Sequence, residues 1–241
     1  MRRVIVIQAR MTSTRLPGKV LMDLGGRTVI EQQLARLQRC ERVDEIVWAV
    51  TTNADDDPLV ALSERLGLRW YRGSEDDVLS RYLGAAREAA ADLVVRVTSD
   101  CPLIDAGEVD AVIAGLEPQY DYANNFTERR LPRGLETEAL WFDTLARVAR
   151  MGTSKPAREH VTWLIHQERP ELFAVRSVVR PYDAGELRWT VDTAEDLELV
   201  RRIYRDLDLG ATQRPFPEIL AYVREHPELA AINAHIEQKR I

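Results

Sequence analysis

The chain has 241 residues, of which 45% are hydrophobic and 30% are charged, and its formal net charge is −6. These values are typical of one soluble α/β domain with a substantial core, and they argue against a disordered chain or a membrane protein. A general nucleic-acid binder is also excluded, because it would need a broad basic face. Two cysteines, Cys40 and Cys101, are too few for a disulfide framework and lack metal-ligand spacing, so the cytoplasm is the expected compartment.

The first expected element is a strand over Val4–Ile7, whose uninterrupted β-branched residues are typical of a strand buried on both faces of a parallel sheet. The loop that follows carries Arg10, Arg15 and Lys19 but no acid. Residues 1–30 hold six cations and one anion, a local charge of 6 − 1 = +5 in an acidic chain. This local excess of positive charge predicts a binding site for an anion.

Hydroxyl groups and backbone N–H groups of residues 12–14 can line an anion-binding concavity in the same loop. Two arginines and one lysine could hold several oxygens along a triphosphate. The loop is not a Walker A motif, because its Gly-Lys pair is followed by Val20 and Leu21 instead of Ser or Thr. A solvated basic loop is the alternative interpretation.

The first half of the chain continues with alternating strands and helices. Further strands are predicted over Ile46–Thr51, Arg69–Tyr71 and Leu93–Thr98. Helices are predicted over Val29–Arg39, Asp57–Leu66 and Asp77–Ala91. This βαβαβαβ series predicts a three-layer α/β fold, a mostly parallel sheet with helices on both faces. Ligands bind such sheets beyond the carboxyl ends of the strands.

The second half is less regular. Its predicted strands are Tyr120–Asn125, Leu172–Val179 and Leu187–Val191. Its predicted helices are Trp141–Arg150, Ala157–Gln167 and Ala194–Asp206, followed by two short helices around the prolines of the tail. With no clear linker, we expect one domain over 1–210, made of a first half (1–118) and a second half (119–210). Residues 211–241 are expected to be a helical extension that packs on the body or on a partner subunit.

Two aspartates, Asp100 and Asp192, each lie at the end of a predicted strand, in the sequences TSD and TVD. If the fold brings them together, they form a two-carboxylate site suited to Mg²⁺, which also takes waters and phosphate oxygens as ligands. Such carboxylates also commonly cap the next helix, and Thr193 and Glu195 make that interpretation reasonable for Asp192. Cys101, beside Asp100, is expected to be a buried structural thiol.

The sequence QARMTSTRLPGK at residues 8–19 resembles the signature loop of the cytidylyltransferases that make CMP-activated acid sugars, the sialate and Kdo type. The spore-coat-polysaccharide branch is the closest match. Five further segments fit this branch in order: RGSEDDVL at 72–79, TSDCPLID at 98–105, RGLETE at 133–138, REHVT at 158–162 and RWTVDT at 188–193. The resemblance covers nearly the whole chain, and it implies a nucleotide-diphospho-sugar transferase (GT-A-like) fold.

The resemblance implies roles for the residues at the matching positions. Arg10, Arg15 and Lys19 would hold the triphosphate and serve catalysis, and Asp100 and Asp192 would hold Mg²⁺. The implied nucleotide-binding set is Gln8, Ala9, Arg10, Met11, Lys19, Thr52, Asn53, Arg72, Asp77 and Ser99. The acidic run before Val78 could instead be the start of a helix, favoured by the helix dipole.

The resemblance also implies that residues 1–118 form the nucleotide-binding half and residues 119–210 the acceptor-binding half. The implied substrate-binding residues are Arg133, Glu136, Glu138, Arg158 and His160. The two arginines could bind an anionic acceptor bidentately, and the histidine could act as a base or be structural. The sequence departs from the sialate and Kdo enzymes around residues 124–138, so neither of their substrates is assumed.

The implied reaction is attack by an acceptor oxygen on the α-phosphorus of CTP with release of pyrophosphate, in surface-polysaccharide or related biosynthesis. The expected partners are CTP, an anionic small molecule and a second copy of the chain in a homodimer. A glycosyltransferase on the same fold is a weaker alternative, because SDCP at 99–102 lacks the usual Asp-x-Asp. A catalytically inactive nucleotide-binding protein is another alternative.

Overall fold

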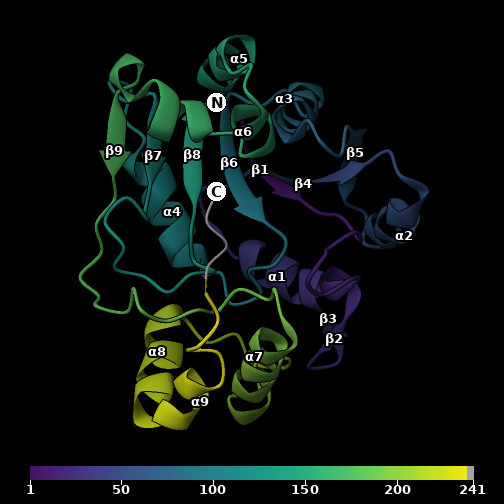
Figure 1. The fold of residues 1–241 in the computed structure, drawn as a ribbon, viewed down its shortest axis with the longest axis vertical. Helices are drawn as coiled ribbons and strands as arrows, with labels where there is room; N and C mark the ends of the chain where they lie inside the picture. Colours follow the sequence, from purple (N-terminus) through teal and green to yellow (C-terminus); the bar gives the residue numbers. More distant parts are fainter. Residues whose placement is uncertain (238–241) are drawn as a thin grey trace.

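A twisted sheet of seven strands runs through the centre of the protein, in the order β5-β4-β1-β6-β8-β7-β9 (Figure 1). The structure is a computed structural model that describes residues 1–237. The strands of the sheet are β1 (Arg3–Gln8), β4 (Glu45–Thr51), β5 (Arg69–Gly73), β6 (Leu93–Thr98), β7 (Tyr122–Asn124), β8 (Glu138–Trp141) and β9 (Val175–Ser177). Only β8 runs antiparallel to its two neighbours, so the sheet is mostly parallel, as predicted.

Helices connect the strands and cover both faces of the sheet. The α-helices are α1 (Val29–Leu37), α2 (Asp57–Arg65), α3 (Val78–Glu88), α4 (Ala106–Gly115), α5 (Phe142–Met151), α6 (Lys155–Glu159), α7 (Ala194–Asp206), α8 (Phe216–Glu225) and α9 (Pro227–Ala231). Shorter helical turns are η1 (Lys19–Leu21), η2 (Ala54–Asp56), the π-helical η3 (Leu164–Glu168) and η4 (Pro170–Leu172). A small hairpin, β2 (Asp23–Leu24) and β3 (Arg27–Thr28), precedes α1.

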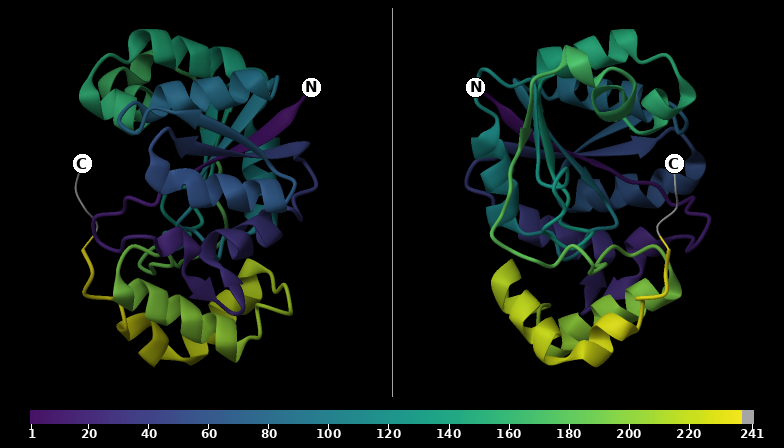
Figure 2. Two further views of the ribbon diagram at one scale, coloured as in Figure 1. Left: turned by 90° about the vertical axis from the view of Figure 1, so that its right-hand side faces the viewer. Right: turned by 60° about the vertical axis from the view of Figure 1, so that its left-hand side comes forward.

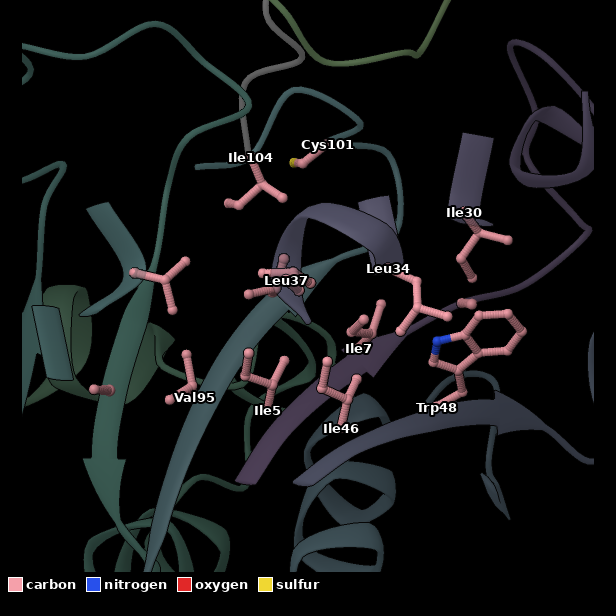
Figure 3. Close-up of a cluster of buried hydrophobic side chains, with 14 of the residues drawn as sticks. Ile5, Ile7, Ile30, Leu34, Leu37, Ile46, Trp48, Val95, Cys101 and Ile104 are labelled. Carbon is pink, nitrogen blue, oxygen red and sulfur yellow. The ribbon is translucent and has the colours of Figure 1, made fainter. Parts of the chain in front are cut away.

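The alternation of side chains along β1 divides the core between the two faces of the sheet. Ile5 and Ile7 pack in one buried cluster with side chains of α1, α2 and α4, and Figure 3 shows Leu34 and Leu37 of α1 lying over them. Val4 and Val6, on the opposite face, pack in a second cluster with side chains of α3 and α5. The predicted three-layer architecture is confirmed.

A third apolar cluster joins α7, α8 and α9 to the loops that follow the central strands. Figures 1 and 2 show these three helices together at one end of the molecule, away from α3 and α5. Trp189 belongs to this third cluster and contacts Phe216 of α8, with ring centroids 5.7 Å apart. The two helices predicted within 211–241 are therefore present, and residues 238–241 lie outside the described part of the chain.

The predicted strands and helices of the first half lie close to their predicted positions, and the structure adds the β2–β3 hairpin and α4, which were not predicted. The second half differs more. The predicted helix over Ala157–Gln167 is interrupted: α6 ends at Glu159, and Val161 adopts φ 53°, a left-handed conformation that no α-helix contains. After this break the chain forms the π-helical η3.

Two predicted strands of the second half are also corrected. The strand predicted over Leu172–Val179 is shortened to β9, and Leu172 belongs instead to a 3₁₀ turn that begins at Pro170. Residues Leu187–Val191 form no strand and contribute a single β-bridge, from Arg188 to Arg133. Within residues 1–237, no helix is both long enough and apolar enough to span a membrane.

Candidate active site

A large cavity of about 1090 Å³ opens at the carboxyl ends of β1 and β6. Its wall combines the basic loop after β1, the start of α3, the end of β6 and the α6 segment. The lining residues are Gln8, Ala9, Arg10, Ser13, Thr14, Arg15, Lys19, Glu75, Asp76, Asp77, Val78, Arg81, Arg96, Thr98, Ser99, Asp100, Lys155, Pro156, Arg158, Glu159, His160 and Asp192. The cavity therefore lies where ligands bind parallel sheets, and its wall carries charges of both signs.

Backbone hydrogen bonds fold the basic loop back on itself. The carbonyl oxygen of Met11 accepts hydrogen bonds from the N–H groups of Ser13 (2.9 Å) and Gly18 (3.0 Å). Gly18 has φ 69°, a left-handed conformation that glycine adopts without strain. The buried carboxylate of Asp56 accepts a hydrogen bond from the N–H of Met11 (2.7 Å) and one from that of Thr51 (2.9 Å). The loop is thus anchored to the end of β4.

Lys19 connects the basic loop to the two aspartates. Its Nζ lies 3.0 Å from Oδ2 of Asp100 and 2.8 Å from Oδ1 of Asp192, and only 11% of its side chain is exposed. The fold thus brings Asp100 and Asp192 together around one ammonium group. Burial lowers the pKa of Lys19, but the two carboxylates outweigh it, so the pKa lies above its ordinary value.

Burial raises the pKa of Asp100, but the charge of Lys19 and hydrogen bonds from Thr98 and Lys19 hold it well below its ordinary value. The Asp100 carboxylate therefore carries a negative charge at neutral pH. Asp192 does not cap the next helix: Thr193 is the N-cap of α7, where it forms a capping box with Asp196. The helix-cap interpretation of Asp192 is thus wrong.

Glu75 forms a second group of contacts at the opposite end of the basic loop. Its carboxylate accepts hydrogen bonds from Arg10 Nη1 (3.0 Å), Thr12 Oγ1 (2.5 Å) and the Asn53 side-chain amide. The hydrogen bond from Thr12, with those from Asn53 and Arg10, keeps the pKa of Glu75 below its ordinary value. Glu75 was not among the predicted site residues, although it lies inside the matched segment RGSEDDVL.

The predicted nucleotide-binding residues divide into two groups. Gln8, Ala9, Arg10, Lys19, Asp77 and Ser99 line the cavity. Met11, Thr52, Asn53 and Arg72 are not part of its lining. The Arg72 guanidinium pairs with Asp57 at the start of α2.

Asp77 has a structural partner at each carboxylate oxygen. It is the N-cap of α3, where Oδ1 accepts the N–H of Ser80 (2.9 Å), and its other oxygen pairs with Arg158 of α6. The helix-start interpretation is therefore correct for Asp77. It lines the cavity as well, so its carboxylate also borders the space open to a ligand.

Only some of the predicted acceptor-binding residues line the cavity. Arg158 and His160 line the cavity, whereas Arg133, Glu136 and Glu138 do not. Glu136 pairs with Arg129 at 2.7 Å. Glu138 is buried, where it accepts hydrogen bonds from Arg96 Nη1 (3.0 Å) and Thr162 Oγ1 (3.0 Å). Burial and the neighbouring Arg129 lower the pKa of Arg133.

Three cations of the cavity wall were missed by the sequence prediction: Arg81, Arg96 and Lys155. Arg96 offered a signal, because it is the one charged residue in the otherwise apolar strand Leu93–Thr98. A charge in a buried strand needs a partner, which is Glu138 on the adjacent strand. Cys101 is buried, as predicted, and burial raises its thiol pKa well above the ordinary value, so it is no nucleophile.

Known proteins resemble this chain in sequence and in fold. A family model described as cytidylyltransferase matches residues 4–216. An uncharacterised protein of Methanocaldococcus jannaschii is 34% identical over 244 residues, which cover 99% of this chain and 97% of that protein. The spore coat polysaccharide biosynthesis protein SpsF of Bacillus subtilis is 30% identical over 238 residues, covering 94% and 96% of the two chains.

Solved structures show the same fold. A cytidylyltransferase from Leptospira borgpetersenii superposes with a TM-score of 0.90 at 27% identity, covering both chains completely. CMP:2-keto-3-deoxy-manno-octonic acid synthetase in complex with CTP has a TM-score of 0.66 at 19% identity, with 86% of this chain and 100% of that chain covered. Rv0371c of Mycobacterium tuberculosis in complex with manganese has a TM-score of 0.57 at 16% identity, with 84% and 99% covered.

Proposed function

Because the chain belongs to the cytidylyltransferase family, we propose that it transfers CMP from CTP to a small acidic acceptor and releases pyrophosphate. One observation carries the proposal: Lys19 of the basic loop lies between Asp100 and Asp192, at the edge of a cavity that the loop borders. A phosphate-binding loop beside two carboxylates is an arrangement suited to nucleotidyl transfer. The proposed acceptor is an acidic sugar or a related acid, in the synthesis of a surface polysaccharide.

The donor set fits a hard divalent cation. Asp100 and Asp192 supply carboxylate oxygens, and no group of three or more His, Cys, Asp or Glu side chains within residues 1–237 is arranged to hold a metal. Two carboxylates suit Mg²⁺, which takes its other ligands from water and from the phosphates of a nucleotide. When bound, the cation would offset charge on the phosphate oxygens of the substrate. The solved manganese and CTP complexes of proteins with this fold support a metal and CTP as ligands.

The cations of the basic loop would hold the triphosphate. Arg10, Arg15 and Lys19 all line the cavity, and each is paired with a carboxylate: Arg10 with Glu75, Arg15 with Asp192, and Lys19 with both aspartates. A bound triphosphate competes with these carboxylates for the same N–H donors. Positive groups placed along the phosphates stabilise the charge that develops when the α-phosphorus is attacked.

The acceptor would enter from the α6 side of the cavity. Arg158 and His160 line that wall, so we assign them to the acceptor and leave Arg133, Glu136 and Glu138 with structural roles. His160 is the candidate base for the attacking hydroxyl. On this proposal residues 1–118 supply the nucleotide side, residues 119–210 supply the acceptor side, and Asp192 of the second half completes the metal site.

The proposal is tested by following pyrophosphate. The protein is incubated with CTP, Mg²⁺ and a panel of acidic sugars and other small acids, and we expect release that depends on one acceptor. CTP binding without release from any acceptor would favour an inactive nucleotide-binding protein. Transfer or hydrolysis of a nucleotide sugar without CTP would favour a glycosyltransferase. Either result would overturn the proposed function.

A further inference from the structure

The carboxylate of Asp192 is held by three cations on two different oxygens. Oδ1 faces Lys19 Nζ at 2.8 Å, and Oδ2 lies 2.6 Å from an Nη2 atom of Arg188 and 3.0 Å from one of Arg15. The side chain of Arg15 is 38% exposed, whereas that of Arg188 is 7% exposed. Arg188 is therefore the buried partner that fixes Oδ2, and it leaves Oδ1 turned towards Lys19.

Arg188 is itself held by a fully buried carboxylate. Asp196 accepts from Nε of Arg188 at 2.9 Å and from Nη2 at 3.1 Å, a two-point contact that fixes the plane of the guanidinium. Oδ2 of Asp196 also accepts the backbone N–H groups of Asp192 and Thr193, each at 3.0 Å. The same carboxylate thus positions both the backbone of Asp192 and the side chain that orients it.

The last member of this network comes from the C-terminal extension, residues 211–241. Asn233 follows α9 and is 3% exposed, and its Nδ2 donates to Oδ1 of Asp196 (2.8 Å) and to the backbone oxygen of Arg188 (2.9 Å). Both partners are acceptors, so only the NH₂ group of the amide fits there. The network consists of Asn233, Asp196, Arg188 and Asp192, in that order.

We infer that Asn233 and Arg188 are positioning residues for the Asp192 carboxylate, and that the C-terminal extension thereby supports the metal site. The inference rests on the proposed function, in which Asp192 is a metal ligand. The guanidinium of Arg188 contacts both Asp192 and Asp196, and Lys19 and Arg15 approach Asp192 from the basic loop. Losing the Asn233 donors leaves Asp196 with fewer partners and frees Arg188 to move.

Partners that orient a metal ligand typically change metal affinity about 10- to 100-fold when they are replaced. Asn233→Asp keeps the size of the side chain but removes both donors, and Asn233→Ala removes the amide. Leu229→Ala is the matched control: Leu229 is 3% exposed in the same extension, and its side chain belongs to the apolar cluster. This control reports what loosening of the extension does without touching the network.

The experiment measures Mn²⁺ binding by electron paramagnetic resonance in the presence of CTP without acceptor, for the full chain and each variant. It also measures the Mg²⁺ concentration that half-saturates pyrophosphate release, and CTP binding in EDTA. We expect both Asn233 variants to raise the Mn²⁺ dissociation constant and the Mg²⁺ requirement about 10-fold or more. CTP binding in EDTA should stay unchanged, and Leu229→Ala should lower only the melting temperature.

Three outcomes would overturn the inference, and they are distinguishable. If the wild type binds Mn²⁺ with CTP and Asp192→Asn abolishes this, but folded Asn233 variants bind as the wild type does, the positioning role is wrong and the proposed function stands. If the wild type itself shows no CTP-dependent Mn²⁺ binding, the metal role of Asp192 and the positioning role fail together. Equal effects of Leu229→Ala and Asn233→Ala on metal affinity would also reject a specific role for Asn233.

Discussion

At the scale of single residues, the proposed chemistry depends most on the buried ammonium group of Lys19. Replacing Lys19 with Met removes the charge from between Asp100 and Asp192 and from the phosphate-binding loop. We expect CMP transfer to fall about 100- to 1,000-fold, the usual effect of removing one preorganised group that stabilises developing charge. The measurement is the initial rate of pyrophosphate release at saturating CTP, Mg²⁺ and acceptor.

The matched control for this variant is Arg27→Met, which removes a cation from the same basic segment. Arg27 is exposed in the β2–β3 hairpin and is not part of the cavity lining. The control should keep its activity, and circular dichroism should show that both variants are folded. A folded Lys19→Met protein with the wild-type rate would contradict the assignment of Lys19 to the triphosphate.

His166 provides a residue-scale prediction of pH dependence. Burial lowers its pKa below the ordinary value of 6.5, and its ring nitrogen lies 2.8 Å from the Tyr122 hydroxyl. The unfolded chain therefore binds a proton more readily than the folded protein does. The contribution of neutral His166 to the free energy of unfolding is therefore fully present above pH 6.5. It is lost as the pH falls from 6.5 towards the lower folded-state pKa, by at most about 1.4 kcal/mol per pH unit.

Urea unfolding at several pH values between 7.5 and 5 checks this expectation. His166→Gln keeps a polar partner for Tyr122 but does not titrate, so its free energy of unfolding should depend less on pH in this window. A variant with the same pH dependence as the wild type would show that His166 contributes nothing to the acid sensitivity of the fold.

At the scale of elements, α1 begins with a capping box that is separate from the cavity. The side chain of Thr28 accepts the N–H of Glu31 (3.3 Å), and the Glu31 carboxylate accepts the N–H of Thr28 (2.9 Å). Thr28→Ala should cost about 1 kcal/mol of stability. For a domain of this size, the melting temperature should fall by about 2–4 °C while the rate of transfer is unchanged. Calorimetry and the pyrophosphate assay check both parts.

The sequence predicts elements well where a local pattern decides the structure. The apolar runs of β1, β4 and β6 and the periodic patterns of α1 and α3 all agree with the structure. Strand β8 was missed because it is short and half of it, Glu138 and Ala139, is of residue types depleted in strands; its backbone pairs with β6, which a local pattern does not indicate. The break in the helix predicted over residues 157–167 depends on a local backbone conformation that no residue type signals.

At the scale of the whole molecule, the C-terminal extension is needed to complete the core. Phe216, Ile219, Val223 and Leu229 are each at most 3% exposed, in the cluster that also contains Trp189. Burial of four such side chains contributes roughly 6–12 kcal/mol, at about 1.5–3 kcal/mol each, against a typical total stability of about 5–15 kcal/mol. A chain ending at Gly210 should therefore fail to fold cooperatively.

Thermal unfolding and limited proteolysis of that shortened chain test this prediction. We expect no sharp melting transition and rapid cleavage within the α7 segment. A soluble shortened chain that melts cooperatively near the wild-type temperature would show that residues 1–210 form an independent domain. Mn²⁺ binding by that shortened chain, which lacks Asn233, would then test the positioning role directly.

Only part of the site was predictable, because the basic loop is continuous in the sequence whereas the other contacts join distant positions. The basic loop is one continuous segment, so the charge of residues 1–30 marks it in the sequence. The approach of Asp192 to Asp100 joins positions 92 residues apart (192 − 100) and depends on the Val191 N–H bonding to the Asp100 carbonyl at 2.8 Å. The roles of Glu75, Arg96 and Asn233 likewise depend on tertiary neighbours, which a single sequence does not display.

The contacts around Asp192 have a consequence for how the protein matures in a cell. Asp100, Asp192 and Asp196 meet three cations of the same chain, namely Lys19, Arg15 and Arg188. These side chains neutralise the carboxylates at the proposed metal site, so we expect the chain to fold without the metal. The chain should therefore still unfold cooperatively on heating in EDTA, and bound metal should only raise its melting temperature. Without the metal the protein would then stay folded but inactive, and it would regain activity when the metal is added back.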